Sequence, residues 1–293
     1  MKVLHLDSGR ELRGGQWQVL RLIEGLKAAG VESTLLARSG SALFETARRK
    51  GWRVEPLGAA RILSRAGEHN LIHAHDARSH TLALIALRTP LVVSRRVAFP
   101  IRSPWKYRRA NCLIAVSGFV RSVLLQAGAP EEKITVVYDG VPLLESRRGT
   151  AVFALDNAGD PEKGAALAAE AARQAGVALQ WTADLERDLA QAGVFVYLSH
   201  SEGLGSAALL AMSAGVPVVA SRVGGLPEII RHGENGLLVE NSAAAVAQAI
   251  RNLTDNPELA ARMGEAGRRA IQENFTVEHM VRRTMEVYRR VLS

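Results

Sequence analysis

The stretch VFVYLSHSEGLGSAALLAMSAGVPVVAS, residues 194–221, carries the pattern that decides the fold. It runs from an apolar strand through the turn Glu202-Gly203-Leu204-Gly205 into an apolar helix, and then back into a second apolar strand. Strands that are apolar along their whole length and alternate with helices are typical of a parallel sheet covered by helices on both faces. This stretch therefore predicts an α/β fold.

The same alternation extends over the whole chain. Strand-like runs in the first half are MKVLHLD, VESTLLAR, WRVEPL, LIHAHD, LVVSRR, CLIAVS and ITVVYDG, and those in the second half are TAVFAL, VALQW, VFVYLS, VPVVAS and GLLVE. Between the halves, PLLESRRGT combines a proline, two arginines and a glycine, as linkers do. We therefore predict two α/β domains, residues 1–145 and 150–275, followed by a C-terminal helix at 276–293.

The composition excludes several classes of protein. With 47% hydrophobic and 23% charged residues in a chain of 293, disorder, collagen and coiled coil are poor interpretations. Cys112 is the only cysteine, so neither an intrachain disulfide nor a cysteine-based zinc site can form, which fits a reducing cytoplasm. The start MKVLHLD is typical of a strand and not of a signal sequence, and no apolar run approaches the roughly 20 residues of a membrane span.

Positive charge is concentrated in the first half. Residues 1–150 hold 24 Lys and Arg against 12 Asp and Glu, whereas residues 151–293 hold 13 against 17. The excess is densest in RRVAFPIRSPWKYRR, and the candidates there for contact with an anionic membrane or with an acceptor are Arg95, Arg96, Arg102, Trp105, Lys106, Arg108 and Arg109. Nucleic acid would be attracted by the same charge, although no recognised nucleic-acid-binding module is present, and a solvated arginine-rich surface is the plain alternative.

Two loops that follow strands in the first half could bind a ligand, because such sheets bind ligands beyond the carboxyl ends of their strands. Gly14-Gly15 opens a helix and could bring backbone amides close to an anion, although a tight turn alone would also use glycine. In His73-Ala74-His75-Asp76 the two histidines point to one face, where a metal could bind. We favour one core histidine and one at the mouth of a cleft, because no third ligand is visible in the sequence.

Two further loops follow strands in the second half. Glu202 stands before the amides of residues 203–205, so a hydroxyl acceptor lies beside the positive end of a helix. A sugar joined to a diphosphate offers hydroxyls to the carboxylate and phosphates to the amides. The alternative is that Glu202 is a solvated glutamate on a surface loop with no ligand. In Pro161-Glu162-Lys163-Gly164, a lysine at the start of a helix could supply a point charge to phosphate.

These loops together resemble those of a family 4 retaining glycosyltransferase of the GT-B fold. The segments that carry the resemblance are GGQWQVLRLIEGLKAAG, LIHAHD, KYRRANCLIAVSGFVRSVLLQAGAPEEKITVVYDGV, DPEKG and SEGLGSAALLAMSAGVPVVASRVGGLPEIIRHGENGLLV. The resemblance implies two Rossmann-like domains that face each other across a cleft, with the C-terminal helix crossing back to the first. It also implies a nucleotide-sugar donor in the second domain and an acceptor in the first, with no metal and no cofactor.

The resemblance assigns roles to particular residues. Glu202 would bind the hydroxyls of the donor sugar, and the amides of Gly203, Leu204 and Gly205 would bind its sugar and phosphates. Lys163 would neutralise the departing diphosphate, which Gly14-Gly15 would approach from the other domain, and His75 would lie by the acceptor. The sequence departs from the family pattern at Leu210, where the family has a second glutamate, in the stretch ALDNAGDPEKG, which lacks the family's arginine, and in a shortened second domain.

We therefore expect a metal-independent retaining glycosyltransferase that acts on a glycan or glycolipid acceptor in cell-envelope polysaccharide or lipopolysaccharide synthesis. We expect it in the cytoplasm, with a peripheral position on the inner face of the membrane left open. The alternative is a GT-B protein without activity of its own that serves as partner or scaffold for another glycosyltransferase; Leu210 and the shortened domain favour that alternative.

Overall fold

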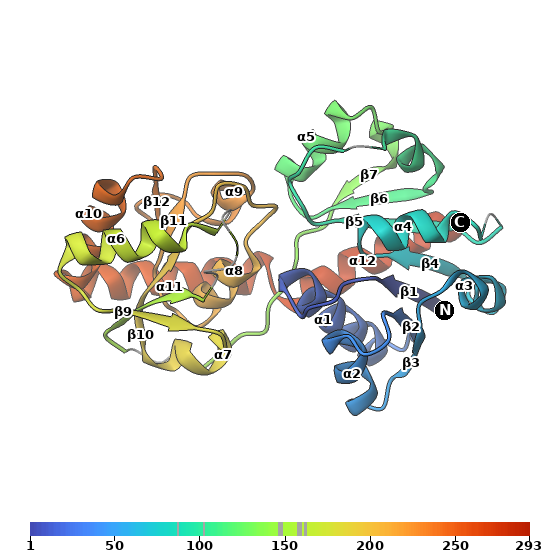
Figure 1. Cartoon of the computed structure of the whole chain (residues 1–293), viewed down its shortest axis with the longest axis horizontal. Helices are drawn as coiled ribbons and strands as arrows, with labels where there is room; N and C mark the ends of the chain where they lie inside the picture. Colours follow the sequence, from blue (N-terminus) through green and yellow to red (C-terminus); the bar gives the residue numbers. More distant parts are fainter. Residues whose placement is uncertain (87, 102, 146–148, 157–159, 161–162) are drawn as a thin grey trace. The chain divides into compact units, whose positions relative to one another are not determined.

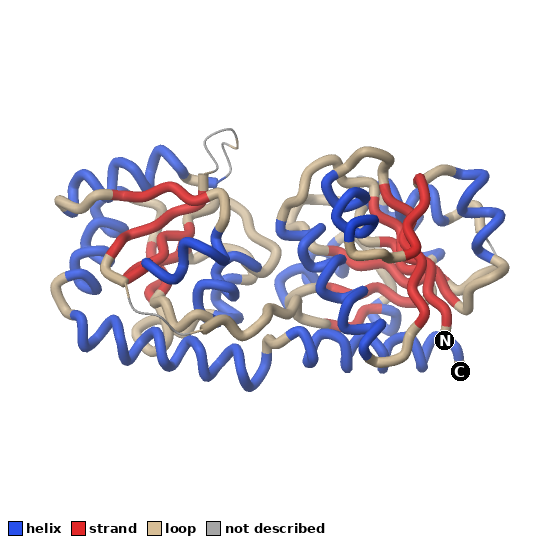
Figure 2. Tube along the Cα trace, turned by 90° about the horizontal axis from the view of Figure 1, so that it is seen from below, coloured by secondary structure: helices blue, strands red, loops and turns tan. Residues whose placement is uncertain are grey.

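The computed structural model describes residues 1–86, 88–101, 103–145, 149–156, 160 and 163–293. The chain divides into two compact units (Figure 1), which are described separately. Unit 1 comprises Met1–Asp139 and Val277–Ser293, and unit 2 comprises Gly140–Thr276. Residues 146–148 of the expected linker lie outside the described residues. Each unit is built on a parallel sheet with helices on its faces (Figure 2), so the predicted fold class of two parallel-sheet α/β domains is confirmed.

The described part of unit 1 holds a seven-stranded parallel sheet in the order β3-β2-β1-β4-β5-β6-β7. Its strands are β1 (Lys2–Asp7), β2 (Glu32–Ala37), β3 (Arg53–Pro56), β4 (Leu71–Ala74), β5 (Leu91–Arg95), β6 (Cys112–Ala115) and β7 (Ile134–Val136). Its helices are α1 (Gly14–Ala28), α2 (Ala42–Arg49), α3 (Ala59–Ala66), α4 (Ala77–Ala83), η1 (Pro104–Arg109), α5 (Gly118–Gln126), η2 (Glu131–Lys133) and α12 (Val277–Leu292).

The last helix belongs to the core of unit 1 although it lies at the other end of the sequence. Val281 and Tyr288 of α12 are buried in one apolar cluster with Leu22 and Leu26 of α1. The two helices approach closely at Gly25, where an added Cβ would lie 2.5 Å from a methyl carbon of Val281. A side chain at Gly25 would therefore push α12 away from α1.

The described part of unit 2 holds a five-stranded parallel sheet in the order β12-β11-β10-β8-β9. Its strands are β8 (Ala151–Leu155), β9 (Leu179–Thr182), β10 (Ala192–Tyr197), β11 (Val218–Ser221) and β12 (Leu237–Val239). Its helices are α6 (Ala165–Ala175), α7 (Leu185–Asp188), η4 (Leu189–Gln191), α8 (Ser206–Ser213), α9 (Leu226–Ile229), α10 (Ala243–Thr254) and α11 (Pro257–Asn274).

One α-helix of the described residues is not predicted from the sequence, and neither are the short 3₁₀-helices η1 and η2. The structure places α3 between the strands formed by WRVEPL and LIHAHD, where no helix is predicted. Helix α3 has only eight residues, of which Ile62 and Ala66 are buried, so its apolar pattern is too short to be recognised in the sequence. Among the helices of the described ranges, none has both the length and the apolarity needed to cross a membrane.

Candidate functional site

The sheet of unit 2 reverses its strand order between β8 and β10. The chain passes from β8 to β9 on one side, and β10 pairs with β8 on the other side. Open parallel sheets bind ligands outside the carboxyl ends of the strands at such a reversal. Lys163 follows β8 and Glu202 follows β10, so both residues lie at the position where a ligand is expected.

Lys163 and Glu202 are in direct contact. The Lys163 Nζ donates to Oε2 of Glu202 over 2.7 Å, and the two side chains are 25% and 14% exposed. The Glu202 carboxylate also accepts hydrogen bonds from the Tyr197 hydroxyl, at 2.6 Å, and from the Gly203 amide, at 3.1 Å. The structure thus brings together two residues singled out in the sequence and adds Tyr197, which the sequence analysis misses. A lone tyrosine at the end of an aliphatic strand is the signal that could have indicated it.

Two glycines after β11 fix the backbone of the Glu202 turn. Gly225 donates its amide to the Glu202 carbonyl over 3.1 Å, and Gly224 has a φ of +56°. An added Cβ would lie 1.9 Å from the Glu202 carbonyl oxygen at Gly224 and 2.2 Å from the Gly203 carbonyl oxygen at Gly225. Only glycine allows this approach, and the position of Glu202 depends on it.

Helix α8 begins directly after this turn. Its N-cap is Gly205, and no acidic side chain lies in its first turn, so the positive end of the helix dipole is not compensated by the helix itself. Leu204 is buried. Leu210 lies on α8 with 6% of its surface exposed and offers no polar atom to a ligand. Pro161 and Glu162, which precede Lys163 in the predicted phosphate loop, lie outside the described residues.

Unit 1 has a corresponding reversal between β1 and β4. Asp7 ends β1, His75 follows β4, and Arg96 follows the neighbouring strand β5. Helix α1 begins at Gly14, and a Cβ built at Gly15 would lie 3.8 Å from Cδ of Arg96. The Gly14-Gly15 turn therefore lies next to a guanidinium group at the edge of the sheet where ligands bind.

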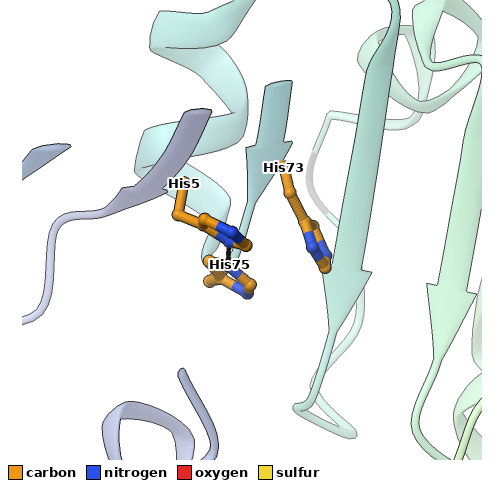
Figure 3. Close-up of side chains that lie close together, drawn as sticks. All are labelled: His5, His73 and His75. Atoms are coloured by element: carbon orange, nitrogen blue, oxygen red, sulfur yellow. Dashed lines mark hydrogen bonds between the residues drawn. The ribbon is translucent and has the colours of Figure 1, made fainter. Parts of the chain in front are cut away.

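Three histidines gather at this edge (Figure 3). His73 and His75 do point to one face, with ring centroids 4.0 Å apart, and His5 from β1 joins them. The ligand atoms of the three rings lie within 4.8 Å of one another. A third histidine is therefore present, contrary to our prediction, because His5 comes from a strand distant in sequence. The sequence predicts that one of the two histidines lies at the mouth of a cleft. His75 is instead buried, with 5% of its surface exposed.

Hydrogen bonds already engage most nitrogens of this cluster. Arg96 can only donate, so its 3.4 Å contact with Nδ1 of His75 places the His75 proton on Nε2, which donates to Nδ1 of His5 over 3.0 Å. The two nitrogens of His73 contact the Tyr288 hydroxyl at 2.6 Å and the Ser94 hydroxyl at 2.7 Å. His73 could bind an ion only by giving up one of these hydroxyls, so the geometry is that of a hydrogen-bonded chain.

Burial keeps these imidazoles neutral. Desolvation lowers the pKa of His5 to about 3, and it holds the pKa values of His73 and His75 well below the usual range, with neighbouring histidines and Arg96 acting in the same direction. A neutral histidine at a binding site offers hydrogen bonds and no charge.

Asp7 is a buried carboxyl that titrates close to neutral pH. Burial, and then the nearby charge of Asp76, raise its pKa to about 6. Its carboxylate accepts from the Gly9 amide at 2.8 Å and from Nε2 of Gln16 at 3.2 Å. Strongly shifted carboxyl groups are concentrated at functional sites, and the sequence analysis misses this one.

Part of the predicted basic surface is not at the surface. Arg95 and Lys106 are buried, because Arg95 donates to the Tyr107 hydroxyl and Lys106 donates to the Ala77 carbonyl, at 3.1 and 2.7 Å. Arg96 forms an ion pair with Asp139 at 3.2 Å, and both side chains are at most 10% exposed. The buried Arg95 and Lys106 are therefore not available to a membrane surface, which corrects that part of their assignment, whereas Arg96 lies in an ion pair at the edge that also holds His75.

Other residues of that segment are exposed. We call Val97, Phe99, Trp105, Arg108 and Arg109 the basic-aromatic patch, and its three apolar members are 43%, 53% and 57% exposed. Arg102, which was also predicted, lies outside the described residues.

Two family models match the chain. The model described as Glycosyltransferase Family 4 matches residues 12–144, and the model described as Glycosyl transferases group 1 matches residues 149–270.

Curated relatives match over a shorter part. The chain is 41% identical over 110 residues to alpha-maltose-1-phosphate synthase of Mycolicibacterium smegmatis, covering 35% of this chain and 28% of that protein. It is 43% identical over 98 residues to D-inositol 3-phosphate glycosyltransferase of Streptomyces coelicolor, covering 33% and 21%. Each match thus spans less than a third of the relative.

Solved structures share the fold over nearly the whole chain. The structure of Anabaena Alr3699/HepE in complex with UDP and glucose has a TM-score of 0.86 at 19% identity, covering 99% of this chain and all of that one. Sucrose-phosphate synthase from Thermosynechococcus elongatus has a TM-score of 0.80 at 18% identity, covering 99% of each chain.

We expect Asp7→Asn to stabilise unit 1 at neutral pH. Because the folded-state pKa of Asp7 is about 6 against an ordinary 3.8, its contribution to stability is present below pH 3.8 and is lost as pH rises through 6. Asparagine keeps an oxygen for the Gly9 amide and carries no charge. The free energy of unfolding should rise by about 1–3 kcal/mol at pH 7.5 and little at pH 4, as measured by urea denaturation.

The matched control is Glu11→Gln, which removes an exposed carboxylate from the same loop. Because its ion pair with Arg13 is exposed, this change should alter the free energy of unfolding by less than about 1 kcal/mol at either pH. A destabilised Asp7→Asn at pH 7.5 would contradict the expectation.

Proposed function

The chain belongs to the family 4 glycosyltransferases of the GT-B fold, and on that premise we propose that it moves a sugar from a nucleotide-diphosphate sugar to a glycan or glycolipid acceptor. We propose retention at the anomeric carbon without a metal ion, in the synthesis of a cell-envelope polysaccharide or lipopolysaccharide. The observation that carries the proposal is the contact of Lys163 with Glu202 at the strand-order reversal of unit 2, beside the start of α8.

This contact supplies the two functions that a nucleotide sugar requires. Glu202 accepts hydrogen bonds from the hydroxyls of the donor sugar, and the amides of Leu204 and Gly205 bind the sugar and the phosphates at the positive end of α8. The Gly203 amide, which the resemblance also assigns to the donor, already donates to Oε1 of Glu202 and helps to orient it. Lys163 compensates the charge that develops on the diphosphate as the bond to the anomeric carbon breaks. The leaving phosphate takes the proton of the acceptor hydroxyl while that oxygen bonds to the anomeric carbon on the same face.

Unit 1 is proposed to bind the acceptor. His75 is buried and neutral, so it can hold a hydroxyl by a hydrogen bond, and its 3.4 Å contact with Arg96 is long enough for a hydroxyl to compete. Helix α1 begins at Gly14, and we propose that the amides of Gly14 and Gly15 bind an anion there, which we assign to the donor diphosphate, as the resemblance implies.

The structures of the Anabaena protein in complex with UDP and with UDP-glucose support a nucleoside diphosphate as the first ligand to test. We expect calorimetric titration with UDP, GDP, ADP and TDP, without added metal, to show clear binding of one of them. Lys163→Ala should weaken that binding, because the lysine pairs with phosphate in this proposal. Arg173→Ala is the control, because it removes an exposed cation from α6.

Absence of binding at millimolar concentration, with the protein shown to be folded, would instead favour the scaffold function. Leu210 supports that second candidate, because it is buried and apolar where the family has a carboxylate.

We expect Glu202→Ala and Lys163→Ala to lower turnover about 100-fold or more without unfolding the chain. Both side chains stand outside the apolar core cluster of unit 2, so both variants should remain folded. Glu202→Ala leaves the buried Tyr197 hydroxyl without its acceptor and should lower the free energy of unfolding by about 1–3 kcal/mol. The measurement is sugar transfer from the nucleotide sugar whose diphosphate binds. Wild-type turnover in both variants would exclude these residues from the site.

The basic-aromatic patch supports a peripheral membrane location. Apolar side chains beside arginines are typical of surfaces that rest on anionic lipid. We expect the wild type to float with phosphatidylglycerol vesicles, and we expect Trp105→Ala and Arg108→Ser each to weaken binding about fivefold.

Trp181→Ala is the matched control, because Trp181 is an exposed tryptophan of unit 2, at 42%. Equal flotation with anionic and neutral vesicles, or unchanged flotation of Trp105→Ala, would remove the membrane from the proposal.

A further inference from the structure

The Glu202 carboxylate is almost saturated with donors. Oε2 accepts from Lys163 at 2.7 Å and from the Tyr197 hydroxyl at 2.6 Å, and Oε1 accepts from the Gly203 amide at 3.1 Å. A carboxylate has about four acceptor positions, so one position on Oε1 remains for a ligand hydroxyl. The three donors therefore fix the orientation of the carboxylate, and with it the direction from which a ligand hydroxyl can approach Oε1.

Two of these three donors differ in how firmly they are held. Lys163 is a flexible side chain at a quarter exposure, and a diphosphate is a stronger attraction for its ammonium group than one carboxylate. Tyr197 is 6% exposed at the end of β10, with its ring stacked on Phe195 at 6.0 Å between centroids. A tyrosine has few rotatable bonds, and this one is fixed by packing.

The Tyr197 ring also contacts the other parts of the site. The Lys163 ammonium lies 5.8 Å from the ring centroid, which is within range of a cation–π interaction. A Cβ built at Gly205, the N-cap of α8, would lie 3.5 Å from Cε1 of Tyr197. One buried ring therefore contacts the lysine and the carboxylate and lies against the start of the helix.

The Tyr197 hydroxyl acts as a hydrogen-bond donor to Glu202. Burial, and then the charge of Glu202, hold the pKa of Tyr197 well above its usual value. At neutral pH the hydroxyl therefore keeps its proton and donates to Glu202.

We propose that Tyr197 is the positioning residue of Glu202: it holds the carboxylate in place when Lys163 leaves it for the donor's diphosphate, so that Oε1 faces the sugar hydroxyls. This inference rests on the proposed function. In the unliganded protein Lys163 is paired with Glu202, and in our proposal a bound diphosphate breaks this ion pair. The hydrogen bond from Tyr197 to Glu202 remains when the diphosphate binds.

The test compares Tyr197→Phe with the wild type. Phenylalanine keeps the ring on Phe195 and Lys163 and removes only the hydroxyl. The control is Tyr107→Phe, which deletes another buried hydroxyl that contacts a charged side chain, that of Arg95 in unit 1. Calorimetry measures the dissociation constants of two kinds of ligand for each variant. The first is the nucleoside diphosphate that binds the wild type, and the second is the set of sugar nucleotides with the same base.

Tyr197→Phe should bind the nucleoside diphosphate within about twofold of the wild type and the sugar nucleotide about tenfold more weakly, because only the sugar contacts Glu202. Tyr107→Phe should bind both as the wild type does. Equal weakening of both ligands by Tyr197→Phe, or no weakening of either, overturns the proposal.

A second measurement separates this inference from the proposed function. Crystal structures of the wild type and of Tyr197→Phe without ligand show whether the Glu202 carboxylate moves. We expect it to turn away from its wild-type position in the variant, and an unmoved carboxylate overturns the proposal. If the wild type binds no nucleoside diphosphate, the proposed function fails, and this comparison still decides whether Tyr197 positions Glu202.

Discussion

Every strand pairing described in the two sheets is parallel, and this requires the chain to cross back over a face of the sheet after each strand. The connections that follow the strands therefore collect at the carboxyl edge, and the strand order reverses at one point of each sheet. Asp7 and His75 flank the reversal in unit 1, and Lys163 and Glu202 flank it in unit 2. The candidate residues of both units are thus placed by the same rule of sheet topology.

This placement depends on contacts that only small residues allow. Gly224 and Gly225 bring the turn after β11 onto the backbone of the Glu202 turn, which would otherwise be a free surface loop. Gly25 lets α12 pack on α1, and Tyr288 of that helix contacts the buried His73. In both units, the functional edge is therefore positioned by residues with no chemistry of their own.

The sequence predicts much of this arrangement and misses the rest for definable reasons. The twelve strands found in the described residues all overlap runs that the sequence predicts as strands, and Glu202 and Lys163 stand in loops whose composition marks them. His5 and Tyr197 lie inside strands that are already explained by core packing, so the pattern gives them no second role. Their importance comes from a neighbouring strand or loop that sequence spacing does not reveal.

The basic segment shows the opposite failure. Its composition predicts an exposed surface, but Arg95 and Lys106 find partners inside unit 1. The sequence shows how many charged side chains a segment holds. It does not show which of them find a hydrogen-bond partner inside the fold. Tertiary contacts therefore divide this segment into a buried ionic part and the exposed basic-aromatic patch.

The carboxyl edges of the two sheets carry different charges, and this difference is consistent with a different ligand at each edge. In unit 2, a lysine and a glutamate remain partly exposed and pair with each other, so an anion can exchange with the carboxylate at little desolvation cost. In unit 1, the histidines are buried and neutral, and Arg96, the cation in contact with His75, is already compensated by Asp139. A charged diphosphate therefore suits the edge of unit 2, whereas a hydroxyl, which needs a hydrogen bond and no counter-charge, suits His75.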